Sequence, residues 1–134
     1  MRSYVFDASP LLAFLQNKTG ATRVSQLLNE AIEGRCEIFI SAANYGEVYS
    51  GVLRTHGQDR ARAVTSAVHP LPINVADATR QRALAAAEVK VKYKRYFSDS
   101  FAAALAIDQK AALVTSDSDF RRVGHSIPIV WLKA

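Results

Sequence analysis

The sequence of 134 residues contains one cysteine, Cys36, and no long apolar run. A single thiol excludes an intrachain disulfide and a metal site built from several thiolates, so we expect Cys36 to be a small buried side chain. No stretch approaches the roughly 20 apolar residues that a membrane-spanning helix needs. Asp7 interrupts the N-terminal apolar run too early for a secretory signal, and we therefore expect a cytoplasmic protein.

Internal repeats and low-complexity tracts are also absent from the sequence. Hydrophobic residues make up 49% of the chain, which is enough for one packed core. We therefore expect a single domain over residues 1–134. The formal net charge is +5, and a basic chain favours a polyanionic partner, of which nucleic acid is the commonest.

Short apolar runs alternate along the chain with segments of helical periodicity. The runs predict strands near residues 4–6, 38–40, 71–75, 112–115 and 127–132. The segments between them predict helices, with N-caps at Ser9, Ser41, Asp77 and Ser98. This alternation indicates an α/β fold, with a mainly parallel five-stranded sheet flanked by helices on both faces.

Acidic residues follow the strands at places where such a sheet binds ligands, beyond the carboxyl ends of its strands. Asp7 comes directly after the first predicted strand, and Asp117 and Asp119 come directly after the fourth. Asp99 lies in the first turn of a predicted helix, and Glu47 lies two turns into the helix after the second strand. We therefore expect these acids to converge on one crevice.

Several carboxylates in one pocket need a counter-charge, because two of them ~4 Å apart repel by roughly 4 kcal/mol at an effective dielectric of 20. Mg²⁺ and Mn²⁺ prefer carboxylate oxygen, and the absence of Cys and His near these positions argues against zinc. A Mg²⁺ or Mn²⁺ site with oxygen ligands only can bind a phosphate and lower the pKa of a metal-bound water. Each acid alone has an ordinary explanation as a turn former, helix-dipole residue or solvated side chain, so the inference depends on their joint arrangement.

Four segments carry these acids, and together they resemble the PIN-domain nucleases, in particular the VapC-type toxins of toxin–antitoxin pairs. The order and spacing of the segments match the family, and the resemblance spans essentially the whole chain. The segments are residues 5–9 (VFDAS), 44–48 (NYGEV), 98–106 (SDSFAAALA) and 114–120 (VTSDSDF).

The resemblance implies a Rossmann-like α/β/α PIN fold and metal-dependent endoribonuclease activity. The family's acidic positions correspond to Asp7, Glu47, Asp99 and Asp117, with Asp119 as a second aspartate beside the fourth. Its supporting polar positions correspond to Ser9, Asn44 and Thr115. It also implies an RNA substrate, a VapB-type antitoxin as partner, and a homodimer or a toxin–antitoxin hetero-oligomer.

On this basis we expect Asp7, Asp99 and Asp117 to bind Mg²⁺, with Mn²⁺ as a possible substitute. Glu47 and Asp119 would complete the shell or position a second ion. Metal-activated water would then attack the phosphate, which predicts products with 5′ phosphate and 3′ hydroxyl ends.

A basic and aromatic stretch precedes Asp99, where family members commonly have a glycine-containing loop. Its cations Lys92, Lys94 and Arg95 are candidates for RNA phosphate contacts, and its tyrosines for base stacking. The ordinary alternative is a solvated cationic helix end. Arg121, close to the Asp117 and Asp119 pair, is a rival phosphate contact.

Three other functions are compatible with parts of this pattern. A receiver or haloacid-dehalogenase-like phosphatase would use Asp7 as a nucleophile, but the phosphatase pattern Asp-x-Asp has Ser9 in its third place. The receiver pattern needs a further acidic pair near the N-terminus, which is missing. A non-catalytic RNA-binding PIN module and a protein that only pairs with an antitoxin are the remaining alternatives.

Overall fold

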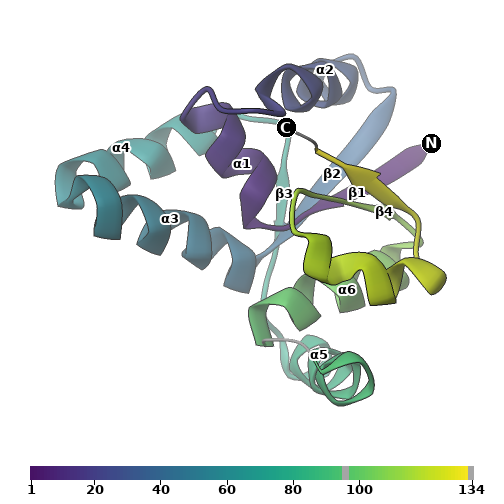
Figure 1. Cartoon of the computed structure of the whole chain (residues 1–134). Helices are drawn as coiled ribbons and strands as arrows, with labels where there is room; N and C mark the ends of the chain where they lie inside the picture. Colours follow the sequence, from purple (N-terminus) through teal and green to yellow (C-terminus); the bar gives the residue numbers. More distant parts are fainter. Residues whose placement is uncertain (95–96, 133–134) are drawn as a thin grey trace.

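The computed structural model describes residues 1–94 and 97–132, in which strands and helices alternate (Figure 1). The strands are β1 (Arg2–Phe6), β2 (Cys36–Ser41), β3 (Asn74–Ala76), β4 (Ala112–Thr115) and β5 (Ile129–Trp131). The α-helices are α1 (Ala8–Leu15), α2 (Ala21–Ile32), α3 (Ala42–His56), α4 (Gln58–Val68), α5 (Arg80–Tyr93) and α6 (Phe97–Gln109). A 3₁₀ helix, η1 (Ser118–His125), precedes β5.

The five strands form one sheet in the order β3-β2-β1-β4-β5, and every neighbouring pair is parallel. The prediction of a mainly parallel five-stranded sheet is therefore confirmed. The order is that of the first five strands of a Rossmann sheet, and its direction of winding reverses between β1 and β4. Ligands of open α/β sheets bind at this switch point, beyond the carboxyl ends of the strands.

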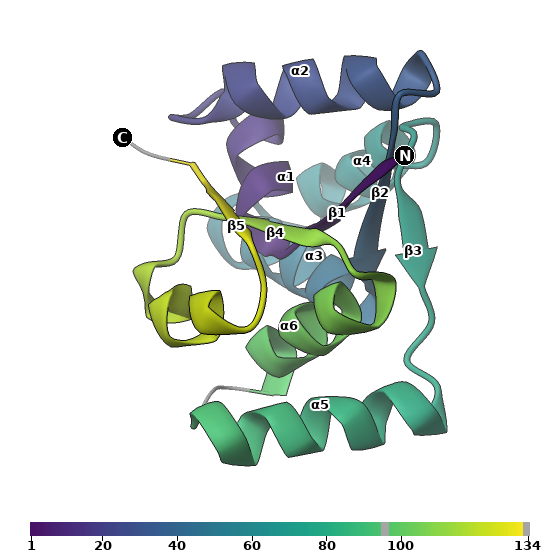
Figure 2. The same cartoon turned by 90° about the vertical axis from the view of Figure 1, so that its right-hand side faces the viewer.

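Helices cover both faces of the sheet because successive strand side chains point to opposite faces. Tyr4 and Phe6 of β1 pack in one core with residues of α1 and α2, whereas Val5 packs in the other core with residues of α5 and α6. Figure 2 shows α1 and α2 on one side of the sheet and α6 on the other, with α5 outside α6. The chain changes face after β3, which produces the switch point.

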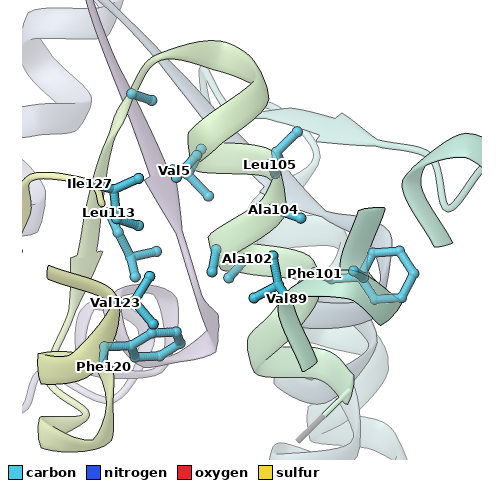
Figure 3. Close-up of a cluster of buried hydrophobic side chains, with 14 of the residues drawn as sticks. Val5, Val89, Phe101, Ala102, Ala104, Leu105, Leu113, Phe120, Val123 and Ile127 are labelled. Atoms are coloured by element: carbon cyan, nitrogen blue, oxygen red, sulfur yellow. The ribbon is translucent and has the colours of Figure 1, made fainter. Parts of the chain in front are cut away.

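Helix α6 is buried between the sheet and α5, and alanines make this position possible. Ala102, Ala103 and Ala106 are fully buried. Their small side chains let the helix approach β1, β2 and β4 closely. Figure 3 shows Phe120 and Val123 of η1 on the sheet side of Ala102. This packing fixes α6, and with it the first turn that carries Asp99.

Two of the predicted N-caps are wrong at the start of α1 and α5. Asp7, and not Ser9, caps α1, because its carboxylate accepts a hydrogen bond from the Ser9 backbone N–H at 3.0 Å. Thr79, and not Asp77, caps α5, and its hydroxyl accepts from the Arg82 backbone N–H at 3.2 Å.

The predicted cap at Ser98 is also wrong, whereas the one at Ser41 is confirmed. Ser98 is the second residue of α6, and its hydroxyl donates to Glu47 instead of accepting from its own helix. The Ser41 hydroxyl accepts from the Asn44 backbone N–H at 3.1 Å and so caps α3.

Strands β3 and β5 are shorter than or shifted from their predicted ranges. The backbone N–H of Ile73 bonds to Leu71 O, a local turn that delays β3 until Asn74. The N–H of Ile127 bonds to Val123 O of η1, so β5 begins at Ile129.

Cys36 is buried in the core beneath α2, as predicted, with its Sγ 3.7 Å from Leu27 O. Among residues 1–94 and 97–132, no helix has the length and apolar character to cross a membrane.

Candidate active site

Asp7 lies where β1 ends and α1 begins, beside the switch point. Only 6% of its surface is exposed. One carboxylate oxygen accepts from the Ser9 N–H at 3.0 Å and from Ser9 Oγ at 2.6 Å. The other oxygen accepts from Thr115 Oγ1 at 2.6 Å. Neutral donors therefore hold a buried carboxylate in one orientation.

Burial raises the pKa of Asp7 from 3.8 to about 6. The hydrogen bonds from Ser9 and Thr115 oppose this rise because they favour the charged form, while the charge of Asp117 raises the pKa further. Asp7 and Asp117 thus repel each other across the switch point. A cation bound between them would remove both the repulsion and part of the burial cost.

Residues at the end of β4 and directly after it complete the surroundings of Asp7. Thr115 Oγ1, which donates to Asp7, also accepts from the Asp117 backbone N–H at 3.0 Å. The Ser116 N–H donates to Ser9 Oγ at 3.0 Å. We call these five residues (Asp7, Ser9, Thr115, Ser116 and Asp117) the switch-point cluster. Its hydrogen bonds join the ends of β1 and β4 into one unit.

Asp117 and Asp119, the two acids that follow β4, have a partly structural role. Asp117 caps η1, and its side chain accepts from the Asp119 backbone N–H at 2.9 Å. Asp117 is half-buried, whereas Asp119 is exposed in the first turn of η1. The turn-forming explanation therefore holds for part of this segment, and Asp117 also lies near enough to Asp7 to raise its pKa.

Glu47 belongs to a second group of hydrogen-bonded residues, between α3 and α6. Asn44 Nδ2 donates to Glu47 Oε1 at 2.9 Å and to the backbone oxygen of Ser98 at 3.2 Å. Ser98 Oγ donates to Glu47 Oε2 at 2.9 Å. We call Ser41, Asn44, Glu47 and Ser98 the interhelix cluster. It joins Glu47 to the turn of α6 that holds Asp99.

The orientation of the Asn44 amide follows from its partners. Ser41 Oγ accepts from the Asn44 backbone N–H, so its own proton is available for Asn44 Oδ1, to which it donates. The amide nitrogen must then face Glu47 and Ser98. Asn44 is fully buried, so water cannot replace these partners. Asn44 and Glu47 thus share one face of α3.

The structure places Asp117 near Asp7 and joins Glu47 to the turn of α6 that carries Asp99, without a complete cage for a metal ion. No hydrogen bond found among residues 1–94 and 97–132 joins the switch-point cluster to the interhelix cluster. Within the same residues, no group of three or more Asp, Glu, His or Cys side chains is arranged so that it could hold a metal ion. Mg²⁺ usually keeps several waters and takes one or two carboxylates plus substrate phosphates. The Asp7 and Asp117 pair fits that mode of binding.

No cationic side chain among residues 1–94 and 97–132 pairs with Asp7, Glu47 or Asp117. The ion pair found between described residues joins Arg35 to Glu33 on the surface. The three acids are thus a set of oxygen ligands that suits a hard divalent cation.

The residues predicted to contact RNA are scattered around the end of α5 and η1. Lys92 Nζ lies 5.2 Å from the centre of the Tyr93 ring, and the Tyr93 hydroxyl is hydrogen-bonded to Ser126. Lys94 is exposed at the C-cap of α5, and Arg121 is exposed on η1. Arg95 lies outside the described residues. Their contacts with RNA stay a prediction.

Sequence reasoning identified Ser41 and Ser98 only as N-caps, and it missed the contacts by which these two residues and Ser116 support the groups around the acids. The spacing of Ser41, Asn44 and Glu47, three residues apart, is a usable signal because it places all three on one side of a helix start. The contact of Ser98 with Glu47 spans 51 residues and has no local signal.

Residues 4–126 match the family model of the PIN domain, so the chain belongs to the PIN-domain family. PIN-domain nucleases generally use divalent metals. The family membership confirms the predicted resemblance and decides against the receiver and phosphatase alternatives. No curated protein sequence matches this chain significantly.

Solved structures of VapBC complexes and of a VapC protein share this fold. The chain aligns with VapBC2 from Rickettsia felis bound to promoter DNA, with a TM-score of 0.78, 15% identity, and 98% and 99% of the two chains covered. DNA-bound VapBC from Salmonella typhimurium gives a TM-score of 0.76, 19% identity, and coverage of 99% and 100%. VapC20 from Mycobacterium tuberculosis, described as a Sarcin-Ricin loop cleaving toxin, gives a TM-score of 0.71, 18% identity, and coverage of 90% and 95%.

Proposed function

We propose that this PIN-domain protein is a Mg²⁺-dependent endoribonuclease that acts as the toxin of a toxin–antitoxin pair. The observation that carries the proposal is the switch-point cluster, in which Thr115 holds the buried carboxylate of Asp7 beside Asp117. Neutral donors orient an acid pair that no described cation compensates, and such a pair suits a hard cation and, with it, a phosphodiester substrate.

The residues divide into ligands and groups that orient them. Asp7, Asp99 and Asp117 would hold the cation, with Glu47 and Asp119 completing its surroundings. Ser9 and Thr115 aim the carboxylate of Asp7, and Asn44 and Ser98 aim that of Glu47. A bound divalent cation supplies an activated water and neutralises the leaving oxygen, which predicts 5′ phosphate and 3′ hydroxyl products.

The partners are inferred from the structural neighbours. Several of these are toxin–antitoxin complexes, and one is a toxin that cleaves the Sarcin-Ricin loop. By analogy we infer a VapB-type antitoxin, an RNA substrate, a homodimer or hetero-oligomer, and a cytoplasmic location. The net charge of +5 favours a polyanionic substrate. A small neighbouring gene whose product co-purifies with this chain and suppresses its activity would support the toxin role.

The proposal predicts RNA cleavage and thermal stabilisation that both depend on the cation. Purified protein should cleave RNA with Mg²⁺ or Mn²⁺ but not with EDTA, and Mg²⁺ should raise Tm by several degrees because it binds only the folded state. Asp99→Asn should lose both effects. Asp108→Asn, an exposed aspartate near the other end of the same helix, should keep both. Equal cleavage by the wild type in Mg²⁺ and in EDTA would exclude the metal-dependent mechanism.

Thr115→Val tests whether the hydroxyl that joins Asp7 to Asp117 is needed. The substitution keeps the volume of a fully buried side chain but removes both hydrogen bonds. We expect cleavage to fall about 10- to 100-fold, the usual cost of losing a group that orients a metal ligand. Thr115→Ser keeps the hydroxyl and should retain most activity. Similar losses in both variants would show that the methyl group matters instead.

A further inference from the structure

A shallow groove opens beside the switch-point cluster, between the end of α1, the loop that follows it and the segments after β4 and β5. Its volume of about 740 Å³ lies in the range of clefts that take small ligands. Ser9 and Ser116 form the wall nearest the acids. Ser9 Oγ accepts from the Ser116 N–H and donates to Asp7 at 2.6 Å. This α1 groove therefore begins one hydrogen bond from Asp7.

The loop that forms the outer wall of the groove has a fixed shape. The Lys18 N–H bonds to Ala13 O at 2.8 Å, and Asn17 adopts a left-handed conformation with φ 50°. Gly20, with φ +95°, lets the loop approach Leu132, because a Cβ at Gly20 would lie only 3.2 Å from Leu132 Cβ. A preformed wall lowers the entropy cost of binding a ligand.

The chemistry of the lining suits a polar anion with a flat apolar surface. Gln16 and Asn17 present side-chain amides, each with a donor and an acceptor, and the described residues include no hydrogen-bond partner for either side chain. Leu12 and Leu132 add apolar surface. Lys18 is the only charged residue among the described lining residues, so no carboxylate repels an anion there.

We propose that the α1 groove binds the nucleotide of a single-stranded RNA next to the cleaved phosphodiester. Lys18 contacts its phosphate, and Gln16 and Asn17 contact the edge of its base, which is exposed in a single strand. This inference rests on the proposed endoribonuclease function and adds a subsite to it. An acidic peptide would also pair with Lys18. Its recognition would not need the side-chain amides of Gln16 and Asn17, and it would not need a groove that leads to Asp7.

The phosphate contact is tested by binding of a short fluorescein-labelled RNA of mixed sequence, measured by fluorescence anisotropy in EDTA so that no metal-dependent cleavage occurs. Lys18→Gln should weaken binding about fivefold to tenfold, and it should reduce the slope of log affinity against log salt by about 0.7, the value for one lost contact with a single strand. Lys110→Gln is the matched control, because Lys110 is an exposed lysine before β4, at the opposite edge of the sheet.

The base contact is tested by the double variant Gln16→Ala with Asn17→Gly, in which glycine preserves the left-handed backbone. In Mg²⁺ this variant should cut a mixed RNA pool at altered positions, as mapped from the RNA ends, while the Lys18 variant cuts more slowly at unchanged positions. An unchanged cut pattern in the double variant would overturn the base contact.

The two hypotheses fail separately. Cleavage by the wild type together with equal RNA affinity and salt slope in Lys18→Gln would keep the proposed function and overturn the subsite. RNA binding that depends on Lys18 without cleavage in Mg²⁺ would support the groove and overturn the endoribonuclease function. Competition by a glutamate-rich peptide as strong as that of RNA of equal charge would assign the groove to a peptide and overturn the proposal.

Discussion

Asp7→Asn should abolish RNA cleavage and at the same time stabilise the metal-free protein. The amide of asparagine lacks the negative charge with which the carboxylate of Asp7 would bind the cation. We therefore expect the rate of cleavage to fall by about 10³-fold or more, which corresponds to roughly 4 kcal/mol of lost transition-state stabilisation. The same change removes a buried carboxylate whose pKa burial raises to about 6. The metal-free variant should therefore unfold with a free energy about 1–3 kcal/mol higher than the wild type near neutral pH.

The pH dependence of stability separates this effect from a general change in packing. The folded wild type holds the Asp7 proton more tightly than the unfolded chain, in which the pKa is 3.8. The contribution of Asp7 to stability is therefore most favourable below about pH 4, and it is lost as pH rises through about 6. The stability advantage of Asp7→Asn should thus be full above about pH 6 and nearly absent below about pH 4. Urea titrations over this range measure it, and an advantage that does not vary with pH would contradict the assigned cause.

Asn44→Asp should destabilise the fold strongly, although it changes few atoms. The new carboxylate would be fully buried, would lose both hydrogen bonds that Nδ2 donates, and would face Glu47 Oε1 at about the present 2.9 Å. We expect the free energy of unfolding to fall by roughly 3–5 kcal/mol near neutral pH, the range for an uncompensated buried charge. Part of the loss should return in acid, when the two carboxylates share a proton.

The matched control is Asn29→Asp, since Asn29 is an exposed asparagine on α2. It should change stability by no more than about 0.5 kcal/mol. Urea denaturation is the suitable measurement because urea, unlike guanidinium chloride, does not screen charges. A small effect at Asn44, equal to that at Asn29, would show that the interhelix cluster tolerates a charge and does not fix the orientation of Glu47.

Hydropathy patterns predicted the fold well because each strand of the sheet is a short apolar run between helices. The N-caps were harder to predict, since several polar residues near a helix start compete for the same N–H groups. Ser9 could not act as a cap once its hydroxyl donated to the stronger acceptor Asp7. Ser98 lies within α6 and does not cap it, because its hydroxyl donates a hydrogen bond to Glu47, which is distant in sequence.

The candidate site was predictable to the extent that position in a parallel sheet determines it. Strand ends placed Asp7 and Asp117 on either side of the switch point, and helix periodicity placed Asn44 beside Glu47. The hydrogen-bond donors that orient these acids could not be predicted from local sequence patterns. Thr115 and Asp7 are 108 residues apart, and nothing in either local segment states which hydroxyl meets which carboxylate oxygen.

The position of β1 in the middle of the sheet has a consequence for protein synthesis. The ribosome makes β1 first, but one of its two neighbours, β4, leaves the ribosome only after α6. Until then Asp7 has neither Thr115 to orient it nor Asp117 beside it. The candidate site is consequently assembled late, because it cannot form while β4 of the nascent chain is still inside the ribosome.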